Sequence, residues 1–231
     1  MILSVSQPYF APYPGFFHKV SRSDTFVILD EVQFPRGTTW VTRNRFKNDK
    51  GILWMTIPVW KKGLGFQKIN EVRIYDEGHH LRKYLASLKS AYGKAPFFQD
   101  HLPFLERIFS AGYERLIEFN VDIIRHILKS LGIGTKIRLL SELGIHSTGE
   151  QRLVDICMEL GARCFLAQNA ARKYLNEDLF QRAGIGIEFF RPPSPVYPQL
   201  WGEFVPNLSA LDLLFNCGPG SRNILSGKRG T

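Results

Sequence analysis

The chain has 231 residues, of which 44% are hydrophobic and 22% charged, the balance of an ordinary globular protein. It holds no apolar run of about 20 residues, the length that spans a bilayer, and no basic segment before its first apolar run, so neither a transmembrane helix nor a secretory signal is expected. Three cysteines without CxxC spacing argue against a disulfide framework or a zinc site, and these features together predict a cytoplasmic protein.

The net charge of +9 is concentrated in one segment. Residues 36–68 carry eight basic side chains against Asp49 alone, and three of the chain's four tryptophans lie among them. Basic residues interleaved with aromatic ones bind phosphates, nucleic-acid bases or anionic lipid headgroups. An interpretation of equal weight is a solvated hairpin whose lysines keep an edge strand from pairing with other chains.

The first 30 residues predict a strand, a short helix and a second strand. Residues 2–5 and 26–29 are apolar runs typical of buried strands, and residues 16–21 between them are long enough for two turns of helix. This βαβ pattern makes the two strands parallel. Ligands of such sheets bind outside the carboxyl ends of the strands, so a site is expected there.

Polar side chains follow both predicted strands. Gln7 and Tyr9 come after the first strand, and Asp30, Glu31 and Gln33 come after the second. A carboxylate in this position can bind a metal or act as a general base, whereas in a structural role Asp30 would cap the turn and Glu31 would be solvated. We interpret Asp30 and Glu31 as candidate catalytic residues, and the other three as candidate substrate-binding residues.

Two segments beside these strands suit an anion. The backbone amides at the start of the short helix can hold an anion with His18 as a donor, although a lone histidine there is more often structural. The segment loosely resembles the nucleotide-binding turn of nucleotidylyltransferases and class I synthetases, which makes His18 a candidate catalytic residue. Arg43, Asn44 and Arg45 offer planar donors for phosphate or carboxylate, with Trp40 close enough in sequence to stack on the ligand.

The middle of the chain predicts a hairpin followed by helices. Residues 52–59 and 68–75 read as two strands that pair in antiparallel fashion. Apolar residues then recur at helical spacing over residues 79–92, 102–109 and 113–131. On the last of these helices His126 is expected on the polar surface, where it compensates the helix dipole. Lys94, in the turn after the first helix, is a further candidate for the anion.

The last third repeats the opening pattern. The predicted strands are residues 136–140, 163–167 and 187–190. One predicted helix begins at a capping box at 148–151, and two others cover 176–183 and 208–215. Four prolines between 192 and 198 predict an extended crossing. Asn169 and Lys173 follow the strand at 163–167, so they are expected at the same sheet edge as Gln7 and Asp30.

These elements add up to an α/β fold with a mixed, largely parallel sheet, flanking helices, an added β-hairpin and a helical subdomain. We expect a single domain over residues 1–218, with the helical insertion at about 77–134, and a flexible basic tail over 219–231. The sequence holds no Walker loop, GxSxG, GxGxxG or HExxH motif, so it names no cofactor and no metal.

Seven short motifs stand out along the chain. They are SQPYFAPYPGFF (6–17), DEVQF (30–34), TRNRF (42–46), YGKAPFF (92–98), RLVDICMELGA (152–162), ARKYL (171–175) and LSALDLLFNCG (208–218). In this order they resemble the WbqC-like proteins, a bacterial family, over nearly the whole chain. The resemblance implies the context of gene clusters for O-antigen and other surface polysaccharides, without an established reaction or catalytic residues.

The first functional hypothesis is an enzyme of surface-polysaccharide biosynthesis that acts by group transfer on an activated anionic substrate such as a nucleotide-linked sugar. Arg43, Arg45 and Lys94 would neutralise its phosphate. The alternative is a non-catalytic module that binds nucleic acid or an anionic surface through residues 36–68. A third hypothesis is a scaffold subunit whose segment 192–201 docks on another enzyme of the same pathway.

Overall fold

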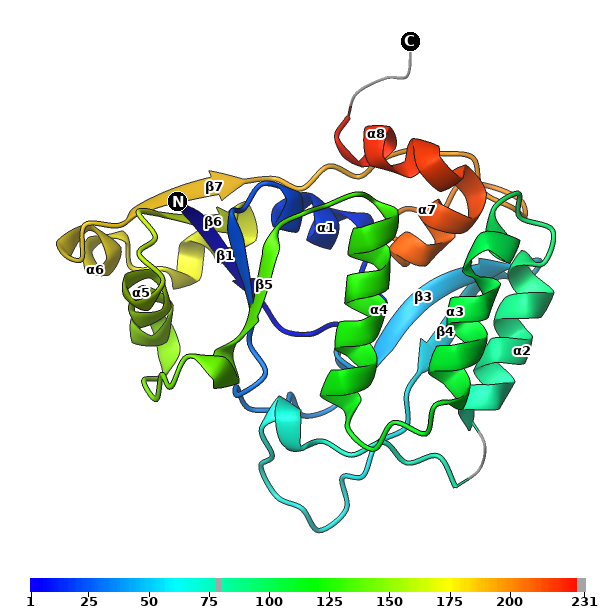
Figure 1. Ribbon diagram of the computed structural model, residues 1–231, viewed down its shortest axis with the longest axis horizontal. Coiled ribbons are helices and arrows are strands. Elements are labelled where there is room, and N and C mark those ends of the chain that lie inside the picture. The colour runs from blue at the N-terminus through cyan, green and yellow to red at the C-terminus, as the bar shows by residue number, and fades with distance from the viewer. Residues whose placement is uncertain (78–79, 228–231) are drawn as a thin grey trace.

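The computed structural model describes residues 1–77 and 80–227 and is built around one parallel sheet (Figure 1). The strand order is β5-β2-β1-β6-β7, and every neighbouring pair is parallel. The strands are β1 (Ile2–Ser6), β2 (Thr25–Ile28), β5 (Lys136–Leu139), β6 (Cys164–Gln168) and β7 (Gly186–Phe190). A separate antiparallel pair consists of β3 (Arg43–Asn48) and β4 (Gly51–Thr56). The predicted α/β fold with an added hairpin is therefore confirmed.

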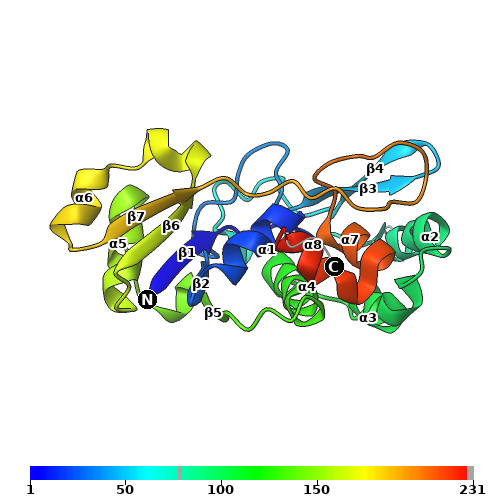
Figure 2. The ribbon, with the colours of Figure 1, turned by 90° about the horizontal axis from the view of Figure 1, so that it is seen from above.

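Helices cover the sheet and extend beyond the hairpin. They are α1 (Pro14–Ser21), α2 (His80–Tyr92), α3 (Phe98–Ser110), α4 (Leu116–Ser130), α5 (Gly149–Glu159), α6 (Glu177–Arg182), α7 (Ala210–Cys217) and α8 (Ser221–Leu225). Figure 1 shows α2, α3 and α4 next to the hairpin, and α5 and α6 at the other end of the molecule. Figure 2 shows the same division from above, with the sheet and α1 between the two groups.

The strand β2 explains why helices pack on both sheet faces. All four of its residues are buried, and the three apolar ones alternate between two apolar clusters. Phe26 and Ile28 join the larger cluster with α1 and α4, whereas Val27 joins the smaller cluster with α5 and α6. Because successive strand residues point to opposite faces, a continuous apolar run requires cover on both sides. This is the arrangement that the apolar runs of the sequence predict.

The predicted pairing of the hairpin is wrong. The sequence pattern joins residues 52–59 to 68–75, but β4 pairs with β3 across the turn at 48–51. Between the two predicted strands, the described residues contain a single isolated bridge, from Val59 to Ile74. The strand β3 shows no alternation of apolar and polar residues, because Arg43 and Arg45 are charged and the buried position between them is Asn44. The sequence pattern therefore does not predict this strand.

Two helix starts also differ from their prediction. The helix α3 begins at Phe98 rather than at residue 102 and accommodates Pro103 within its second turn. Thr148 is the N-cap of α5, but its side chain makes no capping hydrogen bond. Gln151 is the N3 residue of the predicted capping box, but its Nε2 donates to Asp155 Oδ1 at 2.7 Å and its side chain makes no bond to Thr148.

His126 does not have the surface role that its position on α4 predicts. Its ring stacks on Phe104, with ring centroids 3.6 Å apart, and its Nε2 atom lies 2.9 Å from Nδ1 of His101. Burial, followed by the charges of His101, Arg107 and Lys129, lowers the pKa of His126 to about 4. The ring is therefore neutral at pH 7 and does not compensate the dipole of α4.

The C-terminal segment contains ordered structure after residue 218. The helix α8 packs against α1, and Ser221 and Leu225 are buried within the segment predicted as a tail. Residues 228–231 of that segment lie outside the described residues, as does His79, where α2 was expected to begin. The division into a domain with a helical insertion and a tail stays a prediction. No helix of the described residues is long and apolar enough to cross a membrane.

Candidate functional site

The sheet opens between β1 and β6. The strand β1 pairs with β2 from Leu3 to Ser6, but its register with β6 covers only Ile2 and Leu3. The chain leaves β1 toward β2 on one side and leaves β6 toward β7 on the other, so the strand order reverses at this point. Ligands of open α/β sheets bind at such switch points, outside the carboxyl ends of the strands.

A cavity of about 560 Å³ lies at this opening. Four aromatic residues line it, namely Tyr9, Tyr13, Phe16 and Trp40. Its lining also contains three basic residues, Lys19, Arg45 and Arg191, and no Asp or Glu among the described residues. A concave site with aromatic walls and only positive charge suits an anionic ligand that carries a ring.

Two asparagines hold the loop that follows β1. The Nδ2 atom of Asn44 donates to the carbonyl oxygens of Phe10 (2.9 Å) and Ala11 (2.7 Å), and Ala11 has a positive φ of 41°. Asn120 on α4 donates to the carbonyl oxygens of Pro8 and Val41, both at 2.8 Å. These bonds fix one wall of the cavity and make Asn44, which is 2% exposed, a loop clamp.

The proline-rich segment 191–209 forms the opposite wall. Pro192 and Pro193 line the cavity, and Arg45 donates to the carbonyl oxygen of Asn207 at 2.9 Å. The segment is also anchored by Tyr197, whose hydroxyl donates to the buried carboxylate of Asp212 at 2.8 Å. The extended crossing predicted from the prolines is therefore a tethered wall of the site.

Lys19 is the charged group at the closed end of the cavity. It is 8% exposed, and its Nζ donates to the carbonyl oxygen of Val5 at 2.7 Å. Burial lowers the pKa of Lys19 to about 8. Burial also raises the pKa of Tyr9, which therefore keeps its phenolic proton at neutral pH.

Comparison with known proteins places the chain in a family. The family model of the WbqC-like proteins matches residues 7–224. The chain belongs to the WbqC-like protein family. It is 30% identical over 218 residues to the uncharacterised protein Rv1507c of Mycobacterium tuberculosis, a match that covers 94% of each chain. No solved structure matches this WbqC-like protein significantly.

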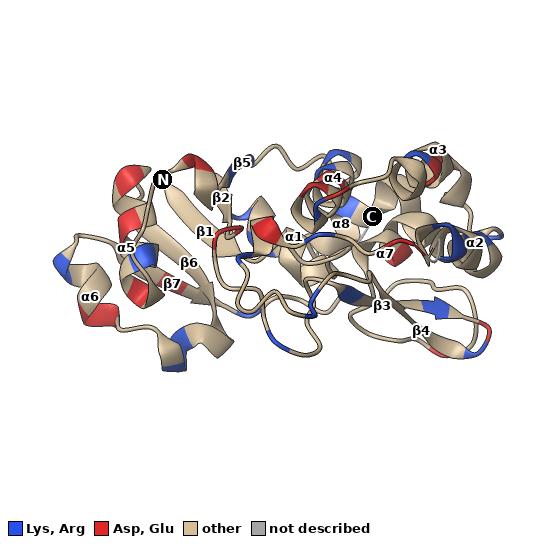
Figure 3. Ribbon diagram, turned by 90° about the horizontal axis from the view of Figure 1, so that it is seen from below, with Lys and Arg blue, Asp and Glu red and all other residues tan. Residues whose placement is uncertain are grey.

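The cavity of this WbqC-like protein brings together four of the residues that the sequence singles out, namely Tyr9, Trp40, Asn44 and Arg45. Arg43 lies beside them on β3, where its guanidinium stacks on Trp54 at 3.7 Å. Figure 3 shows the basic positions of β3 and of the preceding loop in blue. Trp40 and Trp54 remain 45% and 42% exposed, so they form an aromatic rim next to the cavity.

The candidate carboxylates lie outside the cavity lining. Asp30 is 2% exposed and accepts hydrogen bonds from the backbone amide (3.0 Å) and the hydroxyl (2.6 Å) of Ser141. Glu31 pairs with Lys68 at 2.9 Å, and the exposed Gln33 forms a bridge to the same residue. These contacts join β2 to the segments that surround it, and their catalytic role stays a prediction.

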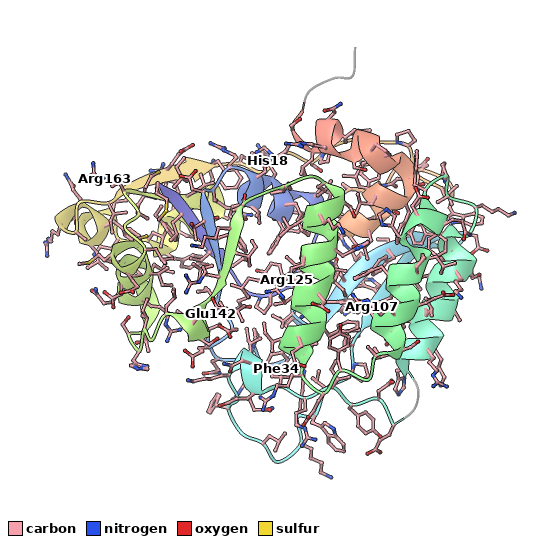
Figure 4. The ribbon with its side chains drawn as sticks, viewed as in Figure 1. His18, Phe34, Arg107, Arg125, Glu142 and Arg163 are labelled. Carbon is pink, nitrogen blue, oxygen red and sulfur yellow. The ribbon has the colours of Figure 1, made fainter. Side chains whose placement is uncertain are left out.

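The remaining candidates are also spread beyond the lining. His18 faces α8, with its Nδ1 atom 3.3 Å from the carbonyl oxygen of Leu225, and Figure 4 shows it where α1 meets that helix. Burial lowers the pKa of His18. The other four candidates outside the lining are Gln7, half-buried after β1, and Lys94, Asn169 and Lys173, which are exposed.

Lys19, Gln168 and Arg191 are among the polar residues of the cavity that sequence reasoning missed. Lys19 is hidden in the buried face of α1, where a lysine is read as a solvated residue. Gln168 ends β6 at the expected edge, and its Nε2 donates to the hydroxyl of Tyr13 at 3.1 Å. Arg191 follows β7 directly. Gln168 and Arg191 could have been found from their position, because each lies where a parallel strand ends.

Proposed function

We propose that this WbqC-like protein is an enzyme of bacterial surface-polysaccharide biosynthesis that transfers a group to or from an activated anionic substrate, such as a nucleotide-linked sugar. The observation that supports the proposal most is the cavity at the switch point, which has three basic and no acidic residues in its described lining. Its volume of about 560 Å³ lies within the range of small-molecule sites.

Each part of such a substrate has a matching group in the cavity. Arg45 and Arg191 supply permanent positive charge for phosphate, because guanidinium groups stay protonated at any physiological pH. Tyr9, Tyr13 and Trp40 offer ring faces for a base or sugar. The biosynthetic context comes from the family resemblance, and group transfer is the reaction class that an activated phosphate-linked sugar undergoes.

The test is binding of a panel of nucleotides and nucleotide sugars, followed by calorimetry on the tightest ligand. Arg191→Ala is the informative variant, because Arg191 is exposed at the rim and lines the cavity. Loss of a charged contact of about 1.5–3 kcal/mol weakens binding about 10- to 100-fold. Arg82→Ala is the matched control, since Arg82 is exposed on α2 outside the lining and its loss should leave affinity unchanged.

The exposed aromatic rim favours one alternative, a non-catalytic module that binds nucleic acid or an anionic surface. The ring centroids of Trp40 and Trp54 lie 6.0 Å apart, and Arg43 stacks on Trp54. Such exposed rings beside a positive charge suit the stacking of unpaired bases. Binding of this kind falls steeply with salt and depends on many charges at once. Affinity only for long polyanions, with no small ligand bound and no effect of Arg191→Ala, would favour this alternative.

A further inference from the structure

Lys19 differs from an ordinary solvated lysine in its position. The helix α1 presents it on the buried face beside Phe16 and Val20, and its side chain reaches the gap where β1 and β6 separate. There Nζ donates to the carbonyl oxygen of Val5, which lies beyond the residues of β1 that pair with β6. The amine therefore stands at the inner end of the cavity, behind the exposed Arg191 and Trp40.

The surroundings of Lys19 disfavour the ammonium form. Among the described residues no carboxylate oxygen lies within 4.0 Å of its Nζ. The ring centroid of Phe26 lies 5.7 Å from Nζ, a contact that only weakly favours the charged form. Arg45 and Arg191 line the same cavity and add positive charge. Burial without a counter-ion lowers the pKa of Lys19 to about 8, so roughly a tenth of the amine is neutral at pH 7.

Lys47 is a second buried lysine whose pKa is lowered by burial, but its amine has different partners. Lys47 is 2% exposed, but its Nζ donates to Gln199 Oε1 (3.2 Å) and to the carbonyl oxygen of Glu203. Lys47 also lies outside the cavity lining. Among the described residues the Nζ of Lys19 has a single hydrogen-bond partner, the carbonyl oxygen of Val5, and two further hydrogens remain on the nitrogen. Its amine is therefore the one that a ligand in the cavity meets.

We propose that Lys19 is a reactive amine that forms an imine with an aldehyde or ketone group of an anionic ligand held in this cavity. The proposal rests on the proposed function, because Arg45 and Arg191 hold the anion while the carbonyl carbon reaches Nζ. Desolvation of a lysine favours its neutral amine, the form that attacks carbonyl groups in imine-forming enzymes.

The chemical step balances without another reactant. The ammonium first loses a proton to solvent, and the lone pair of Nζ attacks the carbonyl carbon to form an N–C bond. The carbonyl oxygen takes up a proton, and transfer of a proton from nitrogen gives a neutral carbinolamine. Loss of the hydroxyl group with the remaining nitrogen proton releases one water and leaves the C=N bond.

The experiment uses pyridoxal 5′-phosphate as the probe, because it joins an aldehyde, an aromatic ring and a phosphate. The full chain is incubated with it, reduced with borohydride and mapped by peptide mass spectrometry. We expect a pyridoxyl adduct on Lys19 at probe concentrations at least tenfold below those that label exposed lysines such as Lys94. The labelling rate should rise about tenfold per pH unit and level off above about 8.

The adduct is mapped on the natural protein, so this part of the test does not depend on whether a variant folds. Lys19→Arg, with its fold checked by circular dichroism, should lose the adduct. Adducts confined to exposed lysines, with Lys19 unlabelled at saturating probe, would overturn the proposal. Pyridoxal without phosphate separates this proposal from the proposed function. Equal labelling of Lys19 by both aldehydes would support the reactive amine and contradict the anion site of the proposed function. Saturable binding of pyridoxal 5′-phosphate without an adduct would contradict the reactive amine and leave the anion site intact.

Discussion

Acid should destabilise the protein through the histidine pair of α3 and α4. His126 has a pKa of about 4 in the folded chain, against an ordinary value of 6.5, and burial also lowers the pKa of His101. Between these two pH values the unfolded chain binds a proton that folded His126 does not bind. The stability that the neutral ring supports is therefore complete above pH 6.5 and is lost as the pH falls toward 4.

The magnitude follows from the difference between the two pKa values. At about 1.4 kcal/mol per pH unit, proton binding by His126 in the unfolded chain removes up to about 2 kcal/mol of stability between pH 6.5 and pH 5. Partial exposure of the folded ring reduces this to about 1–2 kcal/mol. Fully protonating it would also place a charge on the ring that stacks on Phe104 at 3.6 Å. For a chain of this length, each kcal/mol lowers the melting temperature by about 2–4 °C.

The assay is urea unfolding followed by circular dichroism at pH 7, 6 and 5. His126→Gln keeps a polar partner for His101 but does not titrate, so its stability should fall less with pH than that of the natural protein. His146→Gln, at an exposed position, is the matched control and should keep the natural pH dependence. If the natural protein and His126→Gln lose the same free energy of unfolding from pH 7 to pH 5, the reasoning is refuted.

Two further substitutions test packing and hydrogen bonding outside the cavity lining. Gly218→Ala should lower the free energy of unfolding by about 2 kcal/mol or more, because its φ is +48° and the new Cβ would lie 2.4 Å from the ring of Phe97. The control is Gly220→Ala, whose new Cβ meets no atom within 4 Å and should leave thermal unfolding nearly unchanged. Asp30→Ala should cost about 2–3 kcal/mol by leaving two donors of Ser141 unpaired, and unchanged thermal stability would show that this carboxylate is free for another role.

The sequence predicted the strands of the main sheet because most of them are short apolar runs, while β5 alternates charged and apolar residues. Residues 26–29 are the clearest case, since β2 is buried on both faces and needs no alternation. Periodicity failed for β3, where Arg43 and Arg45 face outward and a buried asparagine stands on the inner face. The charged residues that mark this segment as a candidate binding site are also the reason why its strand could not be recognised from periodicity.

The position of the candidate site could be predicted, but its composition could not. Parallel strands place Tyr9 and Gln168 at one edge, and this follows from order and direction alone. The wall formed by residues 191–209 has no periodic pattern, and its place depends on contacts far apart in sequence, such as Arg45 with Asn207. Lys19 could not be recognised as buried, because the helical pattern does not show that the opening of the sheet receives its side chain.

The structure also divides the basic segment that carries most of the net charge. Arg45 and Trp40 line the cavity, and Arg43 stacks beside them on β3. Arg36 lies instead over the ring of Phe66 at 4.1 Å. A guanidinium committed to an aromatic ring or to a backbone carbonyl is held in one geometry, which suits a ligand of fixed shape better than a flexible polyanion. Of the charges fixed in this way, Arg45 lines the cavity, whereas Arg36 lies outside its lining, so under the proposed function Arg45 is the basic residue of this segment that meets the ligand.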